Sequence, residues 1–144
     1  ANIWNGQNQS YFAGGVLDQD SATGIHVINS GIDKNDQGYE ADMRHVRNMT
    51  TASRICMMIS EGTLEKAGEF EPEMKDCADI DLCLNCVKNG LWNVWVCFAE
   101  VNYYGENKIE EYWKQNDPFK KKWEKEIDSG DEFYHPLLKA LKKI

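Results

Sequence analysis

Cysteine is the residue type with the most chemical potential in this chain. Four of its five cysteines, Cys77, Cys83, Cys86 and Cys97, lie in the stretch from Glu73 to Tyr104. In redox proteins a C-x-x-C pair such as Cys83 and Cys86 opens a helix, where the helix dipole lowers the first thiol's pKa. Here the pair falls late in an expected helix, near its negative end, which raises the pKa. The pair therefore does not predict thiol redox chemistry.

Other catalytic or metal-binding patterns are weak. Structural zinc sites usually combine two short cysteine knuckles, and only one pair here is short. The three histidines, His26, His45 and His135, lack both a nearby nucleophile and a metal-ligand spacing such as H-E-x-x-H. Gly14-Gly15 lacks the glycine spacing and the Lys-Ser/Thr pair of a phosphate loop. The sequence predicts no catalytic residue, metal or cofactor, although groups distant in sequence could still converge in space.

Cysteine clustering also bears on compartment. Five cysteines in 144 residues favour disulfides in an oxidising environment. The triplets that begin at Asn8 and Asn48 are acceptor sequences for N-glycosylation. No apolar run is long enough for a membrane span, and no signal-peptide pattern is visible at the start. These features predict a secreted, extracellular glycoprotein with at least one disulfide within the stretch Cys77–Cys97, joining the second expected helix to the apolar segment after it.

Length and charge narrow the class further. A chain of 144 residues, 42% of them hydrophobic, fits one folded domain with a real core. The net charge of −8 repels phosphate backbones, so nucleic acid is not an expected partner.

The elements expected around the cysteines are mostly helices. Residues 1–38 are rich in turn formers and predict an irregular arm, with Gly24–Ile28 as a short strand. The aromatic side chains of Trp4, Tyr11 and Phe12 are expected to pack this arm onto the body. Methionines and other residues recurring at threes and fours predict a helix over residues 39–61, followed by a loop to Glu71.

A second helix is expected from Pro72 to Asn89, capped by Gly90. Leu91–Tyr104 is ambiguous, because Trp92, Val94, Val96 and Phe98 alternate as in a strand while Leu91, Trp95, Phe98 and Asn102 fit a helix. A buried helix is favoured here, because both neighbouring segments are expected to be helical.

The C-terminal third is also expected to be helical. Residues 106–127 predict helix, restarted by Asp117-Pro118 as N-cap and first position, with one seam of Phe119, Trp123, Glu126 and Ile127. A last helix is expected over Pro136–Ile144. The predicted fold is a mainly α, single-domain helical bundle, in which an arm (1–38) and a helical part (39–144) form one domain.

Apolar residues suggest a binding site. Trp92, Trp95 and Phe98 stand within seven residues, and Met57 and Met58 would lie opposite if Cys56 packs near Cys86 or Cys97. Rigid aromatic rings with adaptable methionines could line a pocket for a small ligand. The alternative is that these side chains simply fill the core.

From Cys56 onward the pattern resembles insect odorant-binding proteins and their salivary relatives in blood feeders. The likeness covers about 45 residues and lies in the following positions: Cys56, Gly62, Gly68-Glu69-Phe70, Cys77, Cys86, Cys97 and the aromatic Phe98. The chain departs from the family in having no cysteine before Cys56, Ala52 at the second cysteine's place, and an extra Cys83. The resemblance implies a helical, disulfide-stapled carrier with a Cys77–Cys97 bridge; Cys56 and Cys86 are further disulfide candidates.

The leading functional prediction is therefore a secreted protein that carries or sequesters a small apolar or amine ligand. The alternative is a secreted viral or parasite effector that binds a host macromolecule through its surface, without catalysis. An enzyme is the third possibility.

Overall fold

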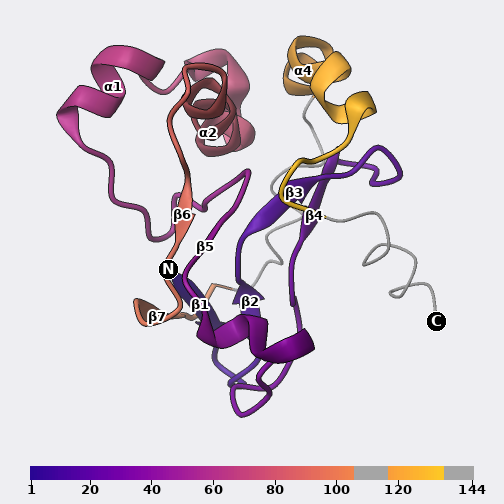
Figure 1. Ribbon diagram of the computed structural model, residues 1–144, viewed down its shortest axis with the longest axis vertical. Coiled ribbons are helices and arrows are strands. Elements are labelled where there is room, and N and C mark those ends of the chain that lie inside the picture. The colour runs from indigo at the N-terminus through magenta and orange to yellow at the C-terminus, as the bar shows by residue number, and fades with distance from the viewer. Residues whose placement is uncertain (106–116, 135–144) are drawn as a thin grey trace.

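The computed structural model describes residues 1–105 and 117–134, and it has a mixed α/β architecture (Figure 1). The prediction of a mainly α bundle is wrong, because the described residues form several small sheets beside a few helices. Helices α1, α2 and α4 gather at one end of the molecule, and the strands extend from them toward the other end (Figure 1). The expected helices over residues 106–116 and Pro136–Ile144 lie outside the described residues.

The N-terminus forms a sheet with a segment from much later in the chain. Strand β1 (Asn2–Asn5) pairs antiparallel with β2 (Ser10–Phe12) and parallel with β7 (Glu100–Tyr103). The turn between β1 and β2 is fixed by the Asn5 side chain, whose Oδ1 accepts the backbone N–H groups of Gln7 and Gln9, each at 2.9 Å. An asparagine that bonds its own following backbone is a common turn former.

Two further strand pairs complete the β structure. Strand β3 (Gly15–Leu17) and β4 (Ile25–Val27) form an antiparallel pair, which confirms the strand expected within Gly24–Ile28. Strand β5 (Arg47–Asn48) pairs antiparallel with β6 (Val94–Trp95). Residues 1–38 are therefore not an irregular arm but contain four strands.

Residues 39–61 do not form the expected helix. A short 3-10 helix, η1 (Tyr39–Arg44), is followed by β5 and extended chain. Inside η1, Glu40 and Ala41 adopt left-handed φ angles of 50° and 61°, which an α-helix cannot contain. The spacing of the methionines reflects separate contacts rather than one helical face.

Helix α1 (Glu61–Ala67) occupies the segment that was expected to be a loop. Its N-cap is Ser60, whose hydroxyl accepts the backbone N–H of Thr63 at 3.1 Å, and its C-cap is Gly68 with a φ of 91°. These are ordinary cap signals, but a helix of two turns leaves little periodicity to detect.

The second helical segment agrees with expectation in its position but is not one continuous helix, because Lys75 has a non-helical φ of 48° and the α-helix begins only at Ala78. Pro72 opens the 3-10 helix η2 (Pro72–Cys77), and α2 (Ala78–Lys88) follows it, with Gly90 just beyond the end. The buried carboxylate of Asp79 accepts the backbone N–H of Arg54 at 2.9 Å, which ties the segment before α1 to α2. Burial raises the pKa of Asp79, against the opposing effect of these hydrogen bonds.

Helix α4 (Asp117–Ser129) begins at the Asp-Pro pair, and its predicted seam is confirmed for the buried Phe119, Trp123 and Ile127, whereas Glu126 is half-buried. That seam joins the largest core cluster, which draws on β1 to β4, η2, α2 and α4. The buried residues of this cluster are Ile3, Phe12, Leu17, Ile25, Val27, Met74, Cys77, Ile80, Leu84, Phe119, Trp123 and Ile127. The N-terminal strands and the helices therefore share one interior, in which Phe12 is buried and Tyr11 packs at the margin, whereas Trp4 is buried in a second cluster with Trp95.

Leu91–Tyr104 is extended rather than helical, so the favoured buried-helix interpretation is wrong and the alternation seen in the sequence is the correct signal. Asn93 anchors the start of β6, because its side-chain amide donates to the carbonyl oxygens of Thr50 and Cys83, each at 2.9 Å. In this segment β6 pairs with β5, and β7 pairs with β1. These pairings supply backbone hydrogen bonds that a helix would have formed within itself.

No disulfide forms among the five cysteines, all of which lie within the described residues, so the predicted disulfides are wrong. Cys77 packs in the largest core cluster, whereas Cys97 packs in a second cluster around Trp4 and Trp95. The physical reason is the extended path after α2, which carries Cys97 away from the helix that holds Cys77. Cys86 packs in a third cluster with Leu82, and Cys56 is half-buried in the loop before α1.

Candidate functional site

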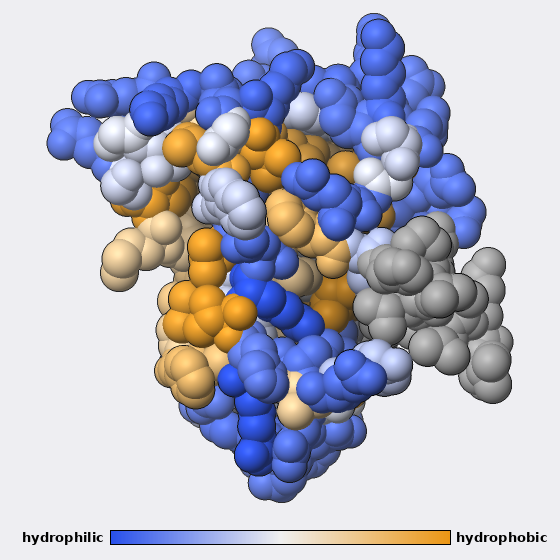
Figure 2. All heavy atoms as spheres, viewed as in Figure 1, coloured by the Kyte–Doolittle hydropathy of each residue, from blue (hydrophilic) through white to orange (hydrophobic). Residues whose placement is uncertain are grey.

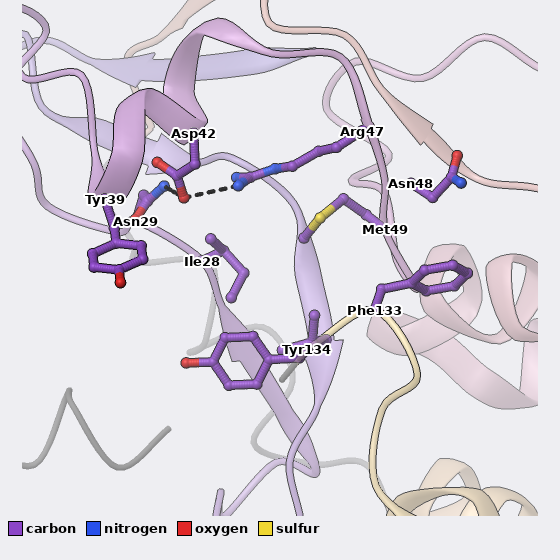
Figure 3. A pocket seen from close by; sticks show the side chains of 10 residues that line it. Ile28, Asn29, Tyr39, Asp42, Arg47, Asn48, Met49, Phe133 and Tyr134 are labelled. Carbon is purple, nitrogen blue, oxygen red and sulfur yellow. Dashed lines mark hydrogen bonds and ion pairs between the residues drawn. The ribbon is translucent and has the colours of Figure 1, made fainter. Parts of the chain in front are cut away.

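The strongest candidate site is a pocket of about 500 Å³ between the β3–β4 pair, η1, β5 and the chain that follows α4. Its apolar walls and polar end are drawn together in Figure 3. The described residues that line it are Val16, Ile28, Asn29, Tyr39, Asp42, Arg47, Asn48, Met49, Phe133 and Tyr134. The side chains of Ile28, Met49 and Tyr134 point into one shared space (Figure 3). A pocket of this size fits a small organic molecule.

The polar end of the pocket is an internally bonded network. The Oδ2 atom of Asp42 accepts from Arg47 Nη1 at 2.8 Å and from Asn29 Nδ2 at 2.7 Å (Figure 3). Arg47 also donates to the carbonyl oxygen of Ala13 at 3.3 Å and lies over the ring of Trp95, 4.7 Å from the centroid. The guanidinium is therefore held in place by a carboxylate, a carbonyl and an aromatic face together.

Backbone geometry at Gly14 sets the position of Met49 in the wall. Gly14 has a φ of 98°, in the region that favours glycine, and a Cβ there would lie 2.5 Å from Met49 Cε. The same glycine accepts the backbone N–H of Ile28 at 2.9 Å. The absence of a side chain at Gly14 leaves room for the Met49 side chain, and the Gly14 carbonyl holds the backbone of Ile28 beside it.

Asp131 fixes the opposite wall. Its Oδ2 atom accepts the backbone N–H of Leu17 at 2.6 Å and the Thr50 hydroxyl at 2.5 Å. Its Oδ1 atom accepts the backbone N–H of Phe133 at 2.8 Å. One carboxylate thus holds the turn that carries Phe133 and Tyr134 against β3, and so positions two of the lining rings.

We expect Asp131→Ala to lower the free energy of unfolding by about 1–3 kcal/mol, because it leaves partly buried donors without their acceptor. The neighbouring Glu132→Ala is the matched control, since Glu132 is exposed and surface substitutions usually change stability by under about 0.5 kcal/mol. Urea denaturation of both variants measures the difference. Equal stabilities would show that Asp131 does not hold this wall.

The structure does not gather the five predicted ligand residues around one enclosed space. Trp92, Phe98 and Met58 are exposed, with Met58 at 99%, while Met57 is half-buried and Trp95 is buried. Trp95 instead supports the pocket from behind, through its ring contact with Arg47. Trp92 approaches the lining residue Phe133, with ring centroids 6.5 Å apart.

Sequence reasoning missed the residues that do line the pocket. They come from separate segments, and no spacing links Ile28 to Met49 or Tyr134. The only local signal is the pair Asp42 and Arg47, which carry opposite charges five residues apart. Side chains at that spacing meet only if the chain turns between them, and the sequence does not indicate such a turn. Asn48, a predicted glycosylation site, lies in β5 and lines the pocket, whereas Asn8 is exposed in the turn between β1 and β2.

The C-x-x-C pair has the properties expected of inert thiols. Cys83 and Cys86 lie in α2 and are buried, and burial raises the pKa of Cys83 to about 12 and also raises that of Cys86. Such thiols stay protonated at neutral pH. The rise comes from burial, which is a different cause from the helix C-terminus on which the expectation rested. Within residues 1–105 and 117–134, no group of three or more His, Cys, Asp or Glu side chains could hold a metal ion.

Comparison of the chain with protein-family models, curated proteins and solved structures found no match. The resemblance to odorant-binding proteins thus stays a prediction. None of the helices in the described ranges has the length and apolar character needed to cross a bilayer.

Proposed function

We propose that this protein binds a small, largely apolar ligand in the pocket between the β3–β4 pair, η1 and β5. The observation that carries the proposal is the pocket's size, about 500 Å³, combined with walls made largely of Val16, Ile28, Met49 and the rings of Phe133 and Tyr134. Ligand sites are typically apolar cavities of this size with a few placed polar groups.

The charges at the polar end favour a neutral ligand over an amine. Asp42 is the one carboxylate among the described lining residues, and its Oδ2 atom already bonds Arg47 and Asn29. An ammonium group brought to Asp42 would be repelled by the Arg47 guanidinium beside it. A neutral ligand leaves this ion pair intact and gains from contact with the apolar walls.

A panel of neutral apolar molecules, fatty acids and hydrophobic amines tests the proposal by thermal unfolding. A ligand at 100 times its Kd stabilises the folded state by about 2.7 kcal/mol, which for this chain length raises Tm by roughly 10 °C. We expect neutral members to produce this rise and amines to produce less. Native mass spectrometry of the purified protein checks whether a ligand is already bound.

Filling the pocket provides the matched variant test. Ile28→Trp places an indole in the lined space and should abolish the ligand-induced rise in Tm, whereas Met58→Trp adds the same ring to a side chain that is 99% exposed. Ile28→Phe is a milder filling if the larger ring prevents folding, since overpacking is itself destabilising. The proposal fails if no panel member raises Tm, or if a folded Ile28 variant binds as the wild type does.

Secretion and glycosylation stay predictions. With no disulfide in the structure, secretion is supported chiefly by the two glycosylation triplets, of which the one at Asn8 is exposed. Expression in a eukaryotic secretory host, followed by mass measurement before and after deglycosylation, would test both. The alternative function, binding of a host macromolecule through the surface, also stays a prediction.

A further inference from the structure

The short helix η1, at the edge of the pocket, has a strained backbone. Glu40 and Ala41 have φ angles of 50° and 61°, and Gly38, just before η1, has a φ of 72°. Left-handed backbone costs energy at a residue that has a Cβ, and strain of this kind is found at ligand clamps and switches. Tyr39 and Asp42, on either side of the strained pair, both line the pocket (Figure 3). The strained pair therefore sets the relative positions of two lining side chains.

The backbone of η1 bonds to its own neighbours in sequence. Met43 N–H donates to the Gln37 carbonyl oxygen at 3.0 Å, and Ala41 N–H donates to the Gly38 carbonyl oxygen at 3.3 Å. Among the described residues, no backbone hydrogen bond joins residues 39–44 to the strands around the pocket. Figure 2 shows mainly hydrophilic residues over this end of the molecule, where η1 and the turns before it lie in Figure 1. The position of η1 therefore depends on a few of its side chains.

Two side chains fasten η1 to the rest of the protein. Asp42 Oδ2 accepts from Asn29 Nδ2, just after β4, at 2.7 Å and from Arg47 Nη1, in β5, at 2.8 Å. Met43 is 6% exposed and packs in the core cluster that contains Trp95. The side chains of Asp42 and Arg47 are each 23% exposed, and water weakens an ion pair that it can reach. The charged contact is therefore a latch that can break without unfolding the core.

We propose that η1 is a flap that opens and closes over the pocket and so controls how fast a ligand enters and leaves. The structure holds the flap closed, with Tyr39 lining the pocket while 56% exposed, at its rim. When the Asp42–Arg47 latch breaks, Glu40 and Ala41 can return to right-handed backbone, so strain favours opening and the latch opposes it. This inference rests on the proposed function, because a flap controls access only if the pocket takes up a ligand.

Hydrogen exchange of the Met43 N–H in the full chain without ligand measures flap opening, because its bond to Gln37 exists only while η1 is formed. Ala41→Gly removes left-handed strain and should slow this exchange by about threefold. Asp42→Ala removes the latch and should speed it by about tenfold or more. Ala22→Gly is the matched control, because Ala22 is exposed in the turn between β3 and β4 and lies outside the left-handed region. It should leave Met43 exchange unchanged.

Stopped-flow binding of a ligand identified in the thermal panel tests whether the flap controls access. Ala41 is not among the described residues that line the pocket, so Ala41→Gly leaves the ligand contacts in place. If opening precedes each entry and exit, this variant should slow association and dissociation by the factor seen in Met43 exchange and leave Kd unchanged. Ala22→Gly should leave both rates at their wild-type values.

Three results would overturn the proposal, and each has a different meaning. If Ala41→Gly and Asp42→Ala do not shift Met43 exchange in opposite directions, while both retain the wild-type circular dichroism, η1 does not open as a latched flap. If a ligand binds and leaves at rates that Ala41→Gly does not change, the pocket binds ligands but η1 does not control access. If exchange responds as expected but no panel molecule binds, the proposed function fails together with control of access, and only the motion of η1 is established.

Discussion

Replacing Asp81 by alanine is expected to lower the free energy of unfolding by about 3–5 kcal/mol, the usual cost of removing one partner from a buried ionic cluster. The Asp81 side chain is 0% exposed. Its carboxylate accepts from Trp123 Nε1 at 2.7 Å and from Lys122 Nζ at 2.8 Å, and the Asn85 amide donates to it at 3.2 Å. The bonds from Trp123 and Lys122 join α4 to α2. Their loss therefore weakens the contact between the two helices and also leaves the buried Trp123 Nε1 without its acceptor.

Two variants separate the contribution of the buried carboxylate from that of surface charge. Asp81→Asn keeps the shape of the side chain but replaces one acceptor oxygen with an NH2 group that faces the donors Trp123 Nε1 and Lys122 Nζ. It should lower the free energy of unfolding by about 1–3 kcal/mol. Glu71→Gln removes the charge of the second carboxylate that pairs with Lys122, whose Nζ lies 2.9 Å from Glu71 Oε1. The Glu71 side chain is about half exposed, and exposed ion pairs contribute under about 1 kcal/mol. Chemical denaturation ranks the three, and an Asp81→Ala cost no larger than that of Glu71→Gln would contradict the prediction.

The same cluster predicts a dependence on pH. Burial disfavours the charged form of Lys122, but its hydrogen bonds to Asp81 and Glu71 outweigh that effect and raise its pKa. A raised lysine pKa contributes stability that is complete below the pKa of the unfolded chain and is lost as pH rises through the folded value. The stability difference between wild type and Asp81→Ala should therefore shrink in alkaline solution.

The elements that could be predicted are those with local end signals. Pro72 and Gly90 bound the segment of η2 and α2, and Asp117-Pro118 starts α4, whose seam repeats at helical spacing. Such signals operate within a few residues, so one sequence is enough to find them. The single strand within Gly24–Ile28 was visible for the same reason, as a short β-branched run between glycines and other turn formers.

The strands that were missed are short, and several depend on partners far away in the chain; β2 and β3 have local partners but contain only three residues each. Strand β1, at the N-terminus, pairs with β7, which begins only at Glu100, and β5 and β6 contain two residues each. Along β6 the alternation was present, but its outward residues Val94 and Val96 are as apolar as the inward Trp95, so the contrast that identifies a strand's two faces was absent. The pocket could not be predicted because its walls depend on these pairings.

Replacing Phe12 by alanine is expected to cost about 3–5 kcal/mol and to destabilise the helices together with the strands. Phe12 lies in β2, is 1% exposed, and belongs to the cluster that includes Ile80 of α2 and Phe119 of α4. A cavity there removes contacts from both parts of the chain at once. Far-ultraviolet circular dichroism, which follows the helices, and tryptophan fluorescence should therefore report one transition, shifted equally in the variant.

The matched control is Phe70→Ala, which removes the same side chain from an exposed position and should change stability by less than about 0.5 kcal/mol. The comparison also tests whether residues 1–38 and 39–144 form one domain. Two transitions, with the helical signal unchanged by Phe12→Ala, would mean that the N-terminal strands unfold independently of the helices. One common transition is expected, because the interior that holds α2 and α4 together is completed by side chains from β1 and β2, and neither part has a core of that size without the other.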